Sequence, residues 1–274
     1  MYEQAAAPPA AWADATPAPS WWRALGARLV TFCWVELAKI RHDQTEIYLR
    51  AIQPALWLII FGETFTRLRA IPTGGHPYLD FMAPGVIAQA AQFMAIFYGI
   101  QIIWEKDAGI LTKLLVTPTP TAALVTGKAF GAAVRSLVQA TVVVVLSALL
   151  GVGLSRNPLN YLGAALVVTL GAAFFTTLSV TIAGLVTNRD RMMGIGQAIT
   201  MPLFFASNAL YPLHVMPPWL QVLSVVNPLS YEVDGLRSLL IGTPGNLPLD
   251  LAVLTLAGGL GIGTASLLLR RLAR

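Results

Sequence analysis

The sequence predicts an all-α polytopic membrane protein with six transmembrane helices, and three features of its 274 residues support this prediction. Hydrophobic residues make up 56% of the chain, charged residues only 11%, and the mean hydropathy is +0.67. Soluble domains carry about 25% charged residues, so most of this chain lies where ionised groups are too costly. Apolar stretches long enough to cross a hydrocarbon core recur along the chain.

The first fifty residues are predicted to lie outside the spans. Residues 1–20, rich in Ala and Pro, are expected to form a flexible cytoplasmic tail and lack the pattern of a secretory signal peptide. Over 21–50, charged residues recur three and four apart, and Trp21, Trp22 and Trp34 accompany an apolar face. This pattern predicts an interfacial amphipathic helix with its aromatic rings at headgroup level, and a soluble amphipathic helix is the alternative.

Six apolar stretches form the predicted membrane domain, residues 51–270. They run over 51–66, 78–104, 122–150, 161–187, 192–213 and 247–269. The first stretch is short and contains Glu63 near its far end, so it is expected to be tilted or partly interfacial. Gly127 and Gly131 are four residues apart, as are Gly259 and Gly263, which predicts close approach between helices.

The distribution of Lys and Arg predicts the orientation in the inner (plasma) membrane. All but Arg67, Arg69, Arg156 and Arg237 of the 18 basic residues fall on one predicted side, which is cytoplasmic by the positive-inside rule. Both termini, including residues 271–274, are therefore predicted to be cytoplasmic. The same bias accounts for the net charge of +5, and without a basic water-soluble module no nucleic-acid partner is expected.

Between the second and third spans, charged residues are mixed with an apolar stripe. The stripe is formed at helical spacing by Ile110, Leu111, Leu114 and Leu115, and Pro118 ends the segment. We expect an amphipathic cytoplasmic helix over about 104–118, which either lies on the membrane surface or docks in a groove of a partner protein.

Before the last span, the region 212–241 is apolar but repeatedly interrupted by proline, asparagine and charged residues. It is too polar to cross a bilayer and too apolar for a plain loop. The pattern predicts short re-entrant or interfacial helices on the outer face, which need protein or water to cover their backbone. Asp234 and Arg237 are three residues apart on such a helix, so they are placed to pair near an outer gate; a surface ion pair of little energetic value is the alternative.

These two segments, Glu105 to Pro118 and Pro202 to Arg237, resemble the permease subunits of type-2 ABC exporters, the family of daunorubicin-resistance and polysaccharide-exporter permeases. The resemblance implies six spans, ABC ATPase subunits as partners and a second permease copy or close relative. It implies ATPase coupling by Glu105, Asp107, Gly109, Leu111 and Leu114, and an outer structural motif of Asn227, Pro228, Tyr231, Asp234 and Arg237. Thr112 and Lys113 stand where the family often has an acidic residue, so the polar docking contacts may not match.

No catalytic or nucleotide-binding pattern is found in the sequence. The nearest approach to a phosphate loop, Gly127-Lys128, has Ala122 and Ala129 where a glycine and a hydroxyl are needed. We therefore expect no cofactor on this chain, with ATP and magnesium bound by the partner subunit. The three histidines are far apart, so no metal site is expected, and no nucleophile constellation suggests an enzyme.

Polar residues within the spans are the candidates for a substrate pathway, although hydrogen bonding between helices is their default role. They are Gln89, Gln92, Gln139, Gln197, Ser207 and Asn208. Charged residues deep in the spans are expected to be few, with Arg135 near an inner end, which argues against ion-coupled transport. The sequence thus favours export of an amphipathic drug or lipid; the alternatives are a lipid-linked glycan or envelope lipid, and, more remotely, an ATP-independent transporter or membrane enzyme.

Overall fold

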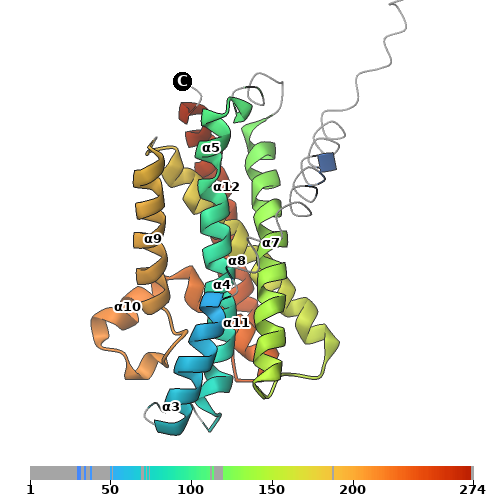
Figure 1. Cartoon of the computed structure of the whole chain (residues 1–274), viewed down its shortest axis with the longest axis vertical. Helices are drawn as coiled ribbons and strands as arrows, with labels where there is room; N and C mark the ends of the chain where they lie inside the picture. Colours follow the sequence, from blue (N-terminus) through green and yellow to red (C-terminus); the bar gives the residue numbers. More distant parts are fainter. Residues whose placement is uncertain are drawn as a thin grey trace, which may run out of the picture.

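The computed structural model describes residues 30, 31, 34, 38, 50, 52–68, 71, 73, 75–111, 113, 120–186 and 188–272. The regular elements in these ranges are all helical (Figure 1). Four helices are long and apolar enough to cross a membrane, and they cover Tyr78–Asp107, Thr121–Leu149, Pro158–Ala183 and Leu247–Leu269. The predicted all-α membrane class is confirmed.

The helices follow one another with short connections. Their bounds are η1 (Trp57–Gly62, a π-helix), α3 (Glu63–Leu68), α4 (Tyr78–Ile100), α5 (Ile102–Asp107), α7 (Thr121–Leu149), α8 (Pro158–Ala183), α9 (Arg189–Phe205), η2 (Leu213–Val215), α10 (Pro218–Val226), α11 (Pro228–Leu240) and α12 (Leu247–Leu272). Three helices begin with an asparagine cap, because the side chains of Asn157, Asn188 and Asn227 accept hydrogen bonds from the first backbone amides.

Helix α4 is the centre of the bundle. It contacts α7, α8, α9, α11 and the first segment, and nearly all of its residues are buried (Figure 1). Hydroxyl groups of neighbouring helices donate to its backbone carbonyls: Ser136 of α7 to Ala91 at 3.0 Å, and Ser179 of α8 to Ile96 at 2.8 Å. These bonds form only because α4 presents small residues and lets the neighbouring backbones come close.

Glycines mark the closest contacts of the bundle. A methyl group added at Gly85 of α4 would lie 2.5 Å from the backbone oxygen of Ala209. In α12 the glycine against α8 is Gly261, which faces Thr177, whereas Gly259 and Gly263 face open space. The predicted close approach through Gly259 and Gly263 is therefore wrong, because the spacing of two glycines does not reveal which helix face is inward.

The first and fifth predicted spans are helical but short. Residues 52–68 form consecutive helical turns around the π-helix, and α9 has 17 residues. Helix α9 ends at Phe205, before the predicted end at residue 213, and irregular turns follow. The count of six spans therefore stays a prediction.

Most of the predicted interfacial helix, 21–50, and the whole tail, 1–20, lie outside the described residues. Of 21–50, only residues 30, 31, 34, 38 and 50 are described, and all five are helical. At the other end, helix α12 reaches Leu272, so the predicted C-terminal segment 271–274 is described only in its first two residues.

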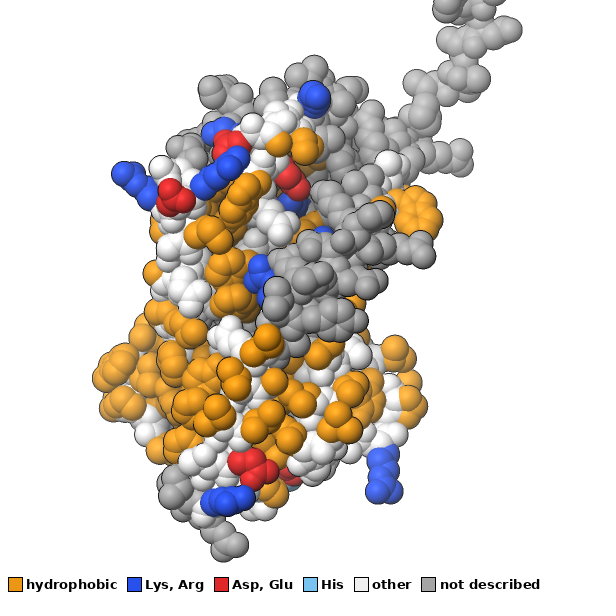
Figure 2. Space-filling view, viewed as in Figure 1, with side chains coloured by type: hydrophobic (Ala, Val, Ile, Leu, Met, Phe, Trp, Pro, Cys, Tyr) orange, Lys and Arg blue, Asp and Glu red, His pale blue; other side chains and the backbone are white. Residues whose placement is uncertain are grey.

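Charged side chains drawn in Figure 2 lie mostly toward the two ends of the long axis, and apolar side chains cover much of the surface between them. Three cations depart from this arrangement. Lys128 and Arg135 of α7 are buried, with 6% and 3% exposure, and Arg237 of α11 is buried with 5%. Arg135 stands halfway along α7, not near an inner end, and Arg237 is not on an outer loop as predicted. Hydropathy misses these positions because it ignores partners on other helices.

We predict that Gly85→Ala destabilises the protein, whereas Gly263→Ala does not. Both changes favour the helical backbone by up to about 1 kcal/mol. At Gly85 the new methyl group meets the backbone of Ala209, and overpacking of this kind costs about 1–3 kcal/mol. Thermal unfolding of the detergent-solubilised variants, followed by size-exclusion chromatography, measures the difference. Equal midpoints for the two variants would refute the close contact.

Candidate functional site

Charged and polar contacts between helices gather in two clusters. The α5 cluster consists of Glu105, Asp107, Lys128 and Arg189, near the end of the bundle where α5 lies (Figure 1). The α11 cluster consists of Phe81, Asn208, Asp234 and Arg237, toward the other end. Each cluster contains residues that the sequence singled out.

In the α5 cluster, Glu105 binds helix α7. The Lys128 amine donates to the Glu105 carboxylate at 2.7 Å and lies 4.7 Å from the centre of the Tyr98 ring. Lys128 is 6% exposed and Glu105 21%, so the pair is shielded from solvent. The carboxylate and the ring face together compensate the burial of the ammonium group.

The second ion pair of this cluster joins α5 to α9. The guanidinium of Arg189 donates to the carboxylate of Asp107 at 2.5 Å. Arg189 is the first residue of α9, and the preceding Asn188 caps that helix by accepting from the amides of Asp190 and Arg191. Helix α5 is thus attached by charged side chains to two different helices, α7 and α9.

The segment after α5 is not the single helix expected over 104–118. Helix α5 ends at Asp107, Ala108 and Gly109 form a turn, and helical geometry resumes at Ile110. Gly109 has φ +71°, in the left-handed region that ends helices and favours glycine. Leu111 is buried, with 3% exposure, and the predicted contact residue Leu114 lies outside the described residues.

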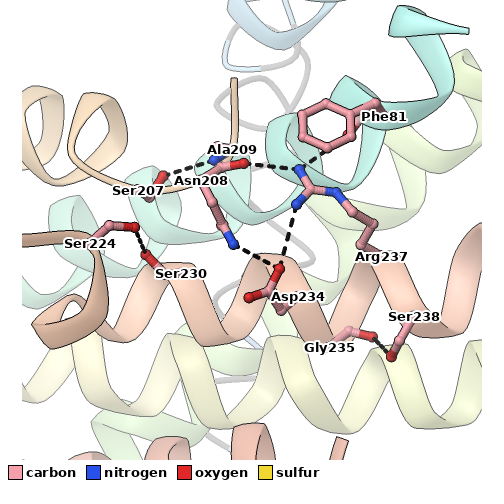
Figure 3. Close-up of polar contacts among 10 residues, drawn as sticks. All are labelled: Phe81, Ser207, Asn208, Ala209, Ser224, Ser230, Asp234, Gly235, Arg237 and Ser238. Carbon is pink, nitrogen blue, oxygen red and sulfur yellow. Dashed lines mark hydrogen bonds and ion pairs between the residues drawn. The ribbon is translucent and has the colours of Figure 1, made fainter. Parts of the chain in front are cut away.

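The α11 cluster is organised by Arg237 (Figure 3). Its guanidinium donates to the backbone oxygens of Asn208 at 3.0 Å and Phe81 at 3.3 Å, and lies 3.8 Å above the Phe81 ring. It also contacts the Asp234 carboxylate at 3.4 Å, which accepts from the Asn208 amide at 2.7 Å. One side chain therefore joins α4, the turn after α9, and α11.

The pair of Asp234 and Arg237 is not a surface pair, since the arginine side chain is only 7% exposed. Helix α11 lies outside the four candidate spans. Burial lowers the pKa of Arg237 to about 10, and the charge of Asp234 opposes this shift, so the guanidinium stays protonated at neutral pH. Burial raises the pKa of Asp234, while Arg237 and the hydrogen bond from Asn208 act in the opposite direction.

The rest of the predicted outer motif fixes the corner between α10 and α11. Asn227 caps α11 and donates its amide to the backbone oxygen of Leu203 in α9 at 2.7 Å. Pro228 occupies the first turn of α11, where its missing N–H costs nothing. The Tyr231 hydroxyl donates to the backbone oxygen of Val225 at 2.8 Å, and Ser224 and Ser230 share a hydrogen bond (Figure 3).

The candidate pathway residues do not form one group. Gln89 and Gln139 line the same cavity, and Gln92 is buried on α4. Gln197 is exposed on α9. Ser207 donates to the backbone oxygen of Phe204, and Asn208 belongs to the α11 cluster.

Some buried polar residues were not singled out from the sequence. Lys128, Arg135 and Gln139 lie on one face of α7 at spacings of seven and four, a pattern that could have revealed them. Glu232 is fully buried on α11 and lies against Gly171 of α8, where only a residue without a side chain leaves room. Within the described part of the chain, no three His, Cys, Asp or Glu side chains are placed to hold a metal ion.

The helices and charge clusters define a multi-pass helical membrane protein, and comparison with known proteins gives its family. A family model described as ABC-2 type transporter matches residues 28–241. A putative transport permease, ycf38, of Porphyra purpurea is 31% identical over 198 residues, covering 71% of this chain and 67% of the relative.

Two further relatives are permeases of bacteria. The daunorubicin resistance ABC transporter permease protein DrrB1 of Streptomyces coeruleorubidus is 27% identical over 229 residues, covering 84% of this chain and 80% of the relative. The inner membrane transport permease YadH of Escherichia coli K12 is 26% identical over 219 residues, with 74% and 82% covered. The chain therefore belongs to the ABC-2 type transporter family and is the membrane permease subunit of an ABC transporter.

We predict that Arg237→Met lowers the free energy of unfolding by about 3 kcal/mol, because the Asp234 carboxylate and two backbone oxygens lose a charged donor. Chemical denaturation of the purified protein measures the loss. Arg156→Met, at an exposed arginine, is the control and should change stability by less than about 0.5 kcal/mol. In an Asp234→Asn background the loss should be smaller, and equal losses in both backgrounds would show that the two side chains do not interact.

Proposed function

We propose that this chain forms the membrane pathway of an ATP-driven exporter, which moves an amphipathic drug or lipid-like compound out of the cell. The observation that carries this proposal is the attachment of α5 to both α7 and α9 by ion pairs, just before the glycine turn. A separate ABC ATPase subunit would hold ATP and magnesium and bind this end of the permease. Export of a lipid-linked glycan or envelope lipid is the alternative within the same mechanism.

In this mechanism α5 carries movement from the ATPase into the membrane domain. Closure of the ATPase subunits on ATP displaces α5, and the displacement passes through Lys128 to α7 and through Arg189 to α9. Helix α9 is the less constrained of the two, because its contacts with other helices are limited mainly to α4 and α8. Movement of α9 relative to α4 gives the two-state element that an ATP-driven switch requires.

A second permease copy is proposed to bind the outward face of α9. Gly194 has no neighbouring atom within the space of a side chain, and Gln197 and Ala198 are exposed beside it. An exposed amide is poorly placed against lipid, whereas small residues and an amide suit contact with another helix. Both termini are proposed to be cytoplasmic, with the first segment and α9 completing six spans and residues 21–50 lying at the interface.

We expect Gly109→Ala to reduce substrate-stimulated ATP hydrolysis several-fold in the reconstituted permease–ATPase complex. A non-glycine residue at φ +71° costs about 1–2 kcal/mol, which distorts the turn that the ATPase contacts. Gly242→Ala is the matched control, because Gly242 has φ +72°, open surroundings and no place in the α5 cluster. Equal ATPase rates in the two variants would rule out the docking assignment.

For the dimer, we expect Ala198→Cys to give a disulfide-linked pair of permeases in membranes treated with copper phenanthroline. The background is Cys33→Ser, since Cys33 is the only cysteine of the sequence. Disulfides need Cα atoms within about 7 Å, so a bond reports direct contact of the two α9 helices. Leu166→Cys, exposed on α8, is the control that should stay monomeric. Cross-linking of the control alone would place the dimer contact on α8.

A further inference from the structure

A polar cavity lies inside the helical bundle, between the first segment, α4 and α7. Its polar lining comes from Arg50, Gln53, Gln89 and Gln139, and its apolar lining includes Phe93. The volume open to the centre of a water-sized sphere is about 10 Å³, which is room for about one water molecule. The cavity belongs to neither the α5 cluster nor the α11 cluster.

Two amides face this cavity without partners. Gln89 and Gln139 are 2% and 1% exposed, and neither side-chain amide has a hydrogen-bond partner among the described residues. Each amide offers two donors and one acceptor. A buried polar group without a partner costs several kcal/mol in an apolar setting, on the order of 2–7 kcal/mol, so this pair points to an occupant with hydrogen-bonding atoms.

The charge of the lining selects among such occupants. Arg50 contributes a positive charge, and the described lining contains no Asp or Glu. The Arg50 guanidinium lies over the rings of Phe93 and Phe97, at 5.7 and 5.3 Å from their centres. A guanidinium matches the planar oxygens of carboxylate and phosphate groups, and amide N–H groups donate to the same oxygens.

The depth of the cavity explains why a membrane transporter needs it. Gln89 lies eleven residues into α4 from Tyr78, about 16 Å along the helix axis, so the cavity lies far from the helix ends. An amphipathic compound crossing the bilayer must bring its polar head through the hydrocarbon region, where an unpartnered charge is very costly. A polar cavity at this depth gives the head a place to rest.

We propose that this cavity binds the acidic head of an amphipathic molecule, with Gln89, Gln139 and Arg50 holding its oxygens and Phe93 contacting its apolar chain. The assignment to cargo rests on the proposed export function, of which it names the substrate class. Because the closed cavity holds about one water, the head enters when the first segment moves away from α4. A bilayer lipid with an anionic head has the same chemistry, so both sources are tested.

The test is photolabelling of the full-length permease with its ATPase partner in nanodiscs of neutral phosphatidylcholine, without nucleotide. The probe is a palmitic acid with a diazirine near its carboxylate, compared with its methyl ester, and labelled peptides are mapped by mass spectrometry. The acid should label the α4 and α7 peptides around Gln89 and Gln139 about fivefold more than the ester, the change expected for one lost hydrogen bond. Equal labelling by acid and ester overturns the proposal.

The double variant Gln89→Leu, Gln139→Leu should lose the preference for the acid without lowering the melting temperature, because the replaced amides have no partner among the described residues. Gln101→Leu is the matched control: it removes an amide on the same helical run, outside the cavity lining, and should keep the preference. Unchanged labelling in the double variant overturns the site. A lowered melting temperature together with unchanged preference would assign the amides to helix packing alone.

A second series of nanodiscs contains phosphatidylglycerol and separates the two sources. Competition by this lipid assigns the cavity to an anionic bilayer lipid, whereas labelling that persists assigns it to a transported compound; either result supports binding of an acidic head. The labelling needs no ATP hydrolysis. Loss of ATPase coupling with labelling intact would therefore overturn the export mechanism and leave the cavity assignment standing.

Discussion

The close approach of neighbouring backbones to α4 is the constraint on which the rest of the structure depends. Gly85 meets the backbone of Ala209, and Gly99 meets Ser179 and Thr176 of α8. At these distances the hydroxyls of Ser136, Thr176 and Ser179 reach α4 carbonyls, so polar groups in the bundle are satisfied between helices. A larger residue on α4 would separate the helices and break both kinds of contact, which is why the core of this bundle behaves as one unit.

The charged clusters use this core in opposite ways. Arg237 ties α11 and the turn after α9 to the core through backbone oxygens, so that end is held by bonds in several directions. The α5 cluster instead connects the core to helices that have freedom to move, because α9 touches few other helices. A rigid centre with a movable edge is the arrangement that a two-state transporter needs, since interfaces switch between discrete packings and cores do not deform smoothly.

Predictions that depend on contacts near in sequence agree with the structure. The i, i+3 spacing of Asp234 and Arg237 predicted their pairing, and the carbonyl partners of Arg237 could not be inferred because Phe81 lies far away in the chain. Lys128 and Arg135 were assigned to a cytoplasmic side and an inner end by the positive-inside rule. They are buried in α7 because Glu105 and Tyr98, on another helical run, compensate their charges.

The sequence by itself determined the helical membrane class, four of the spans and the location of the two informative segments, because hydrophobicity and the residues near helix ends act locally. Only the tertiary structure decided which glycines allow close contact, where the segment after α5 breaks, and which glutamines share a cavity. Gln89 and Gln139 are fifty residues apart and meet because α4 and α7 pack side by side. A burial pattern of this kind arises from the pairing of whole helix faces, which periodicity along one helix does not specify.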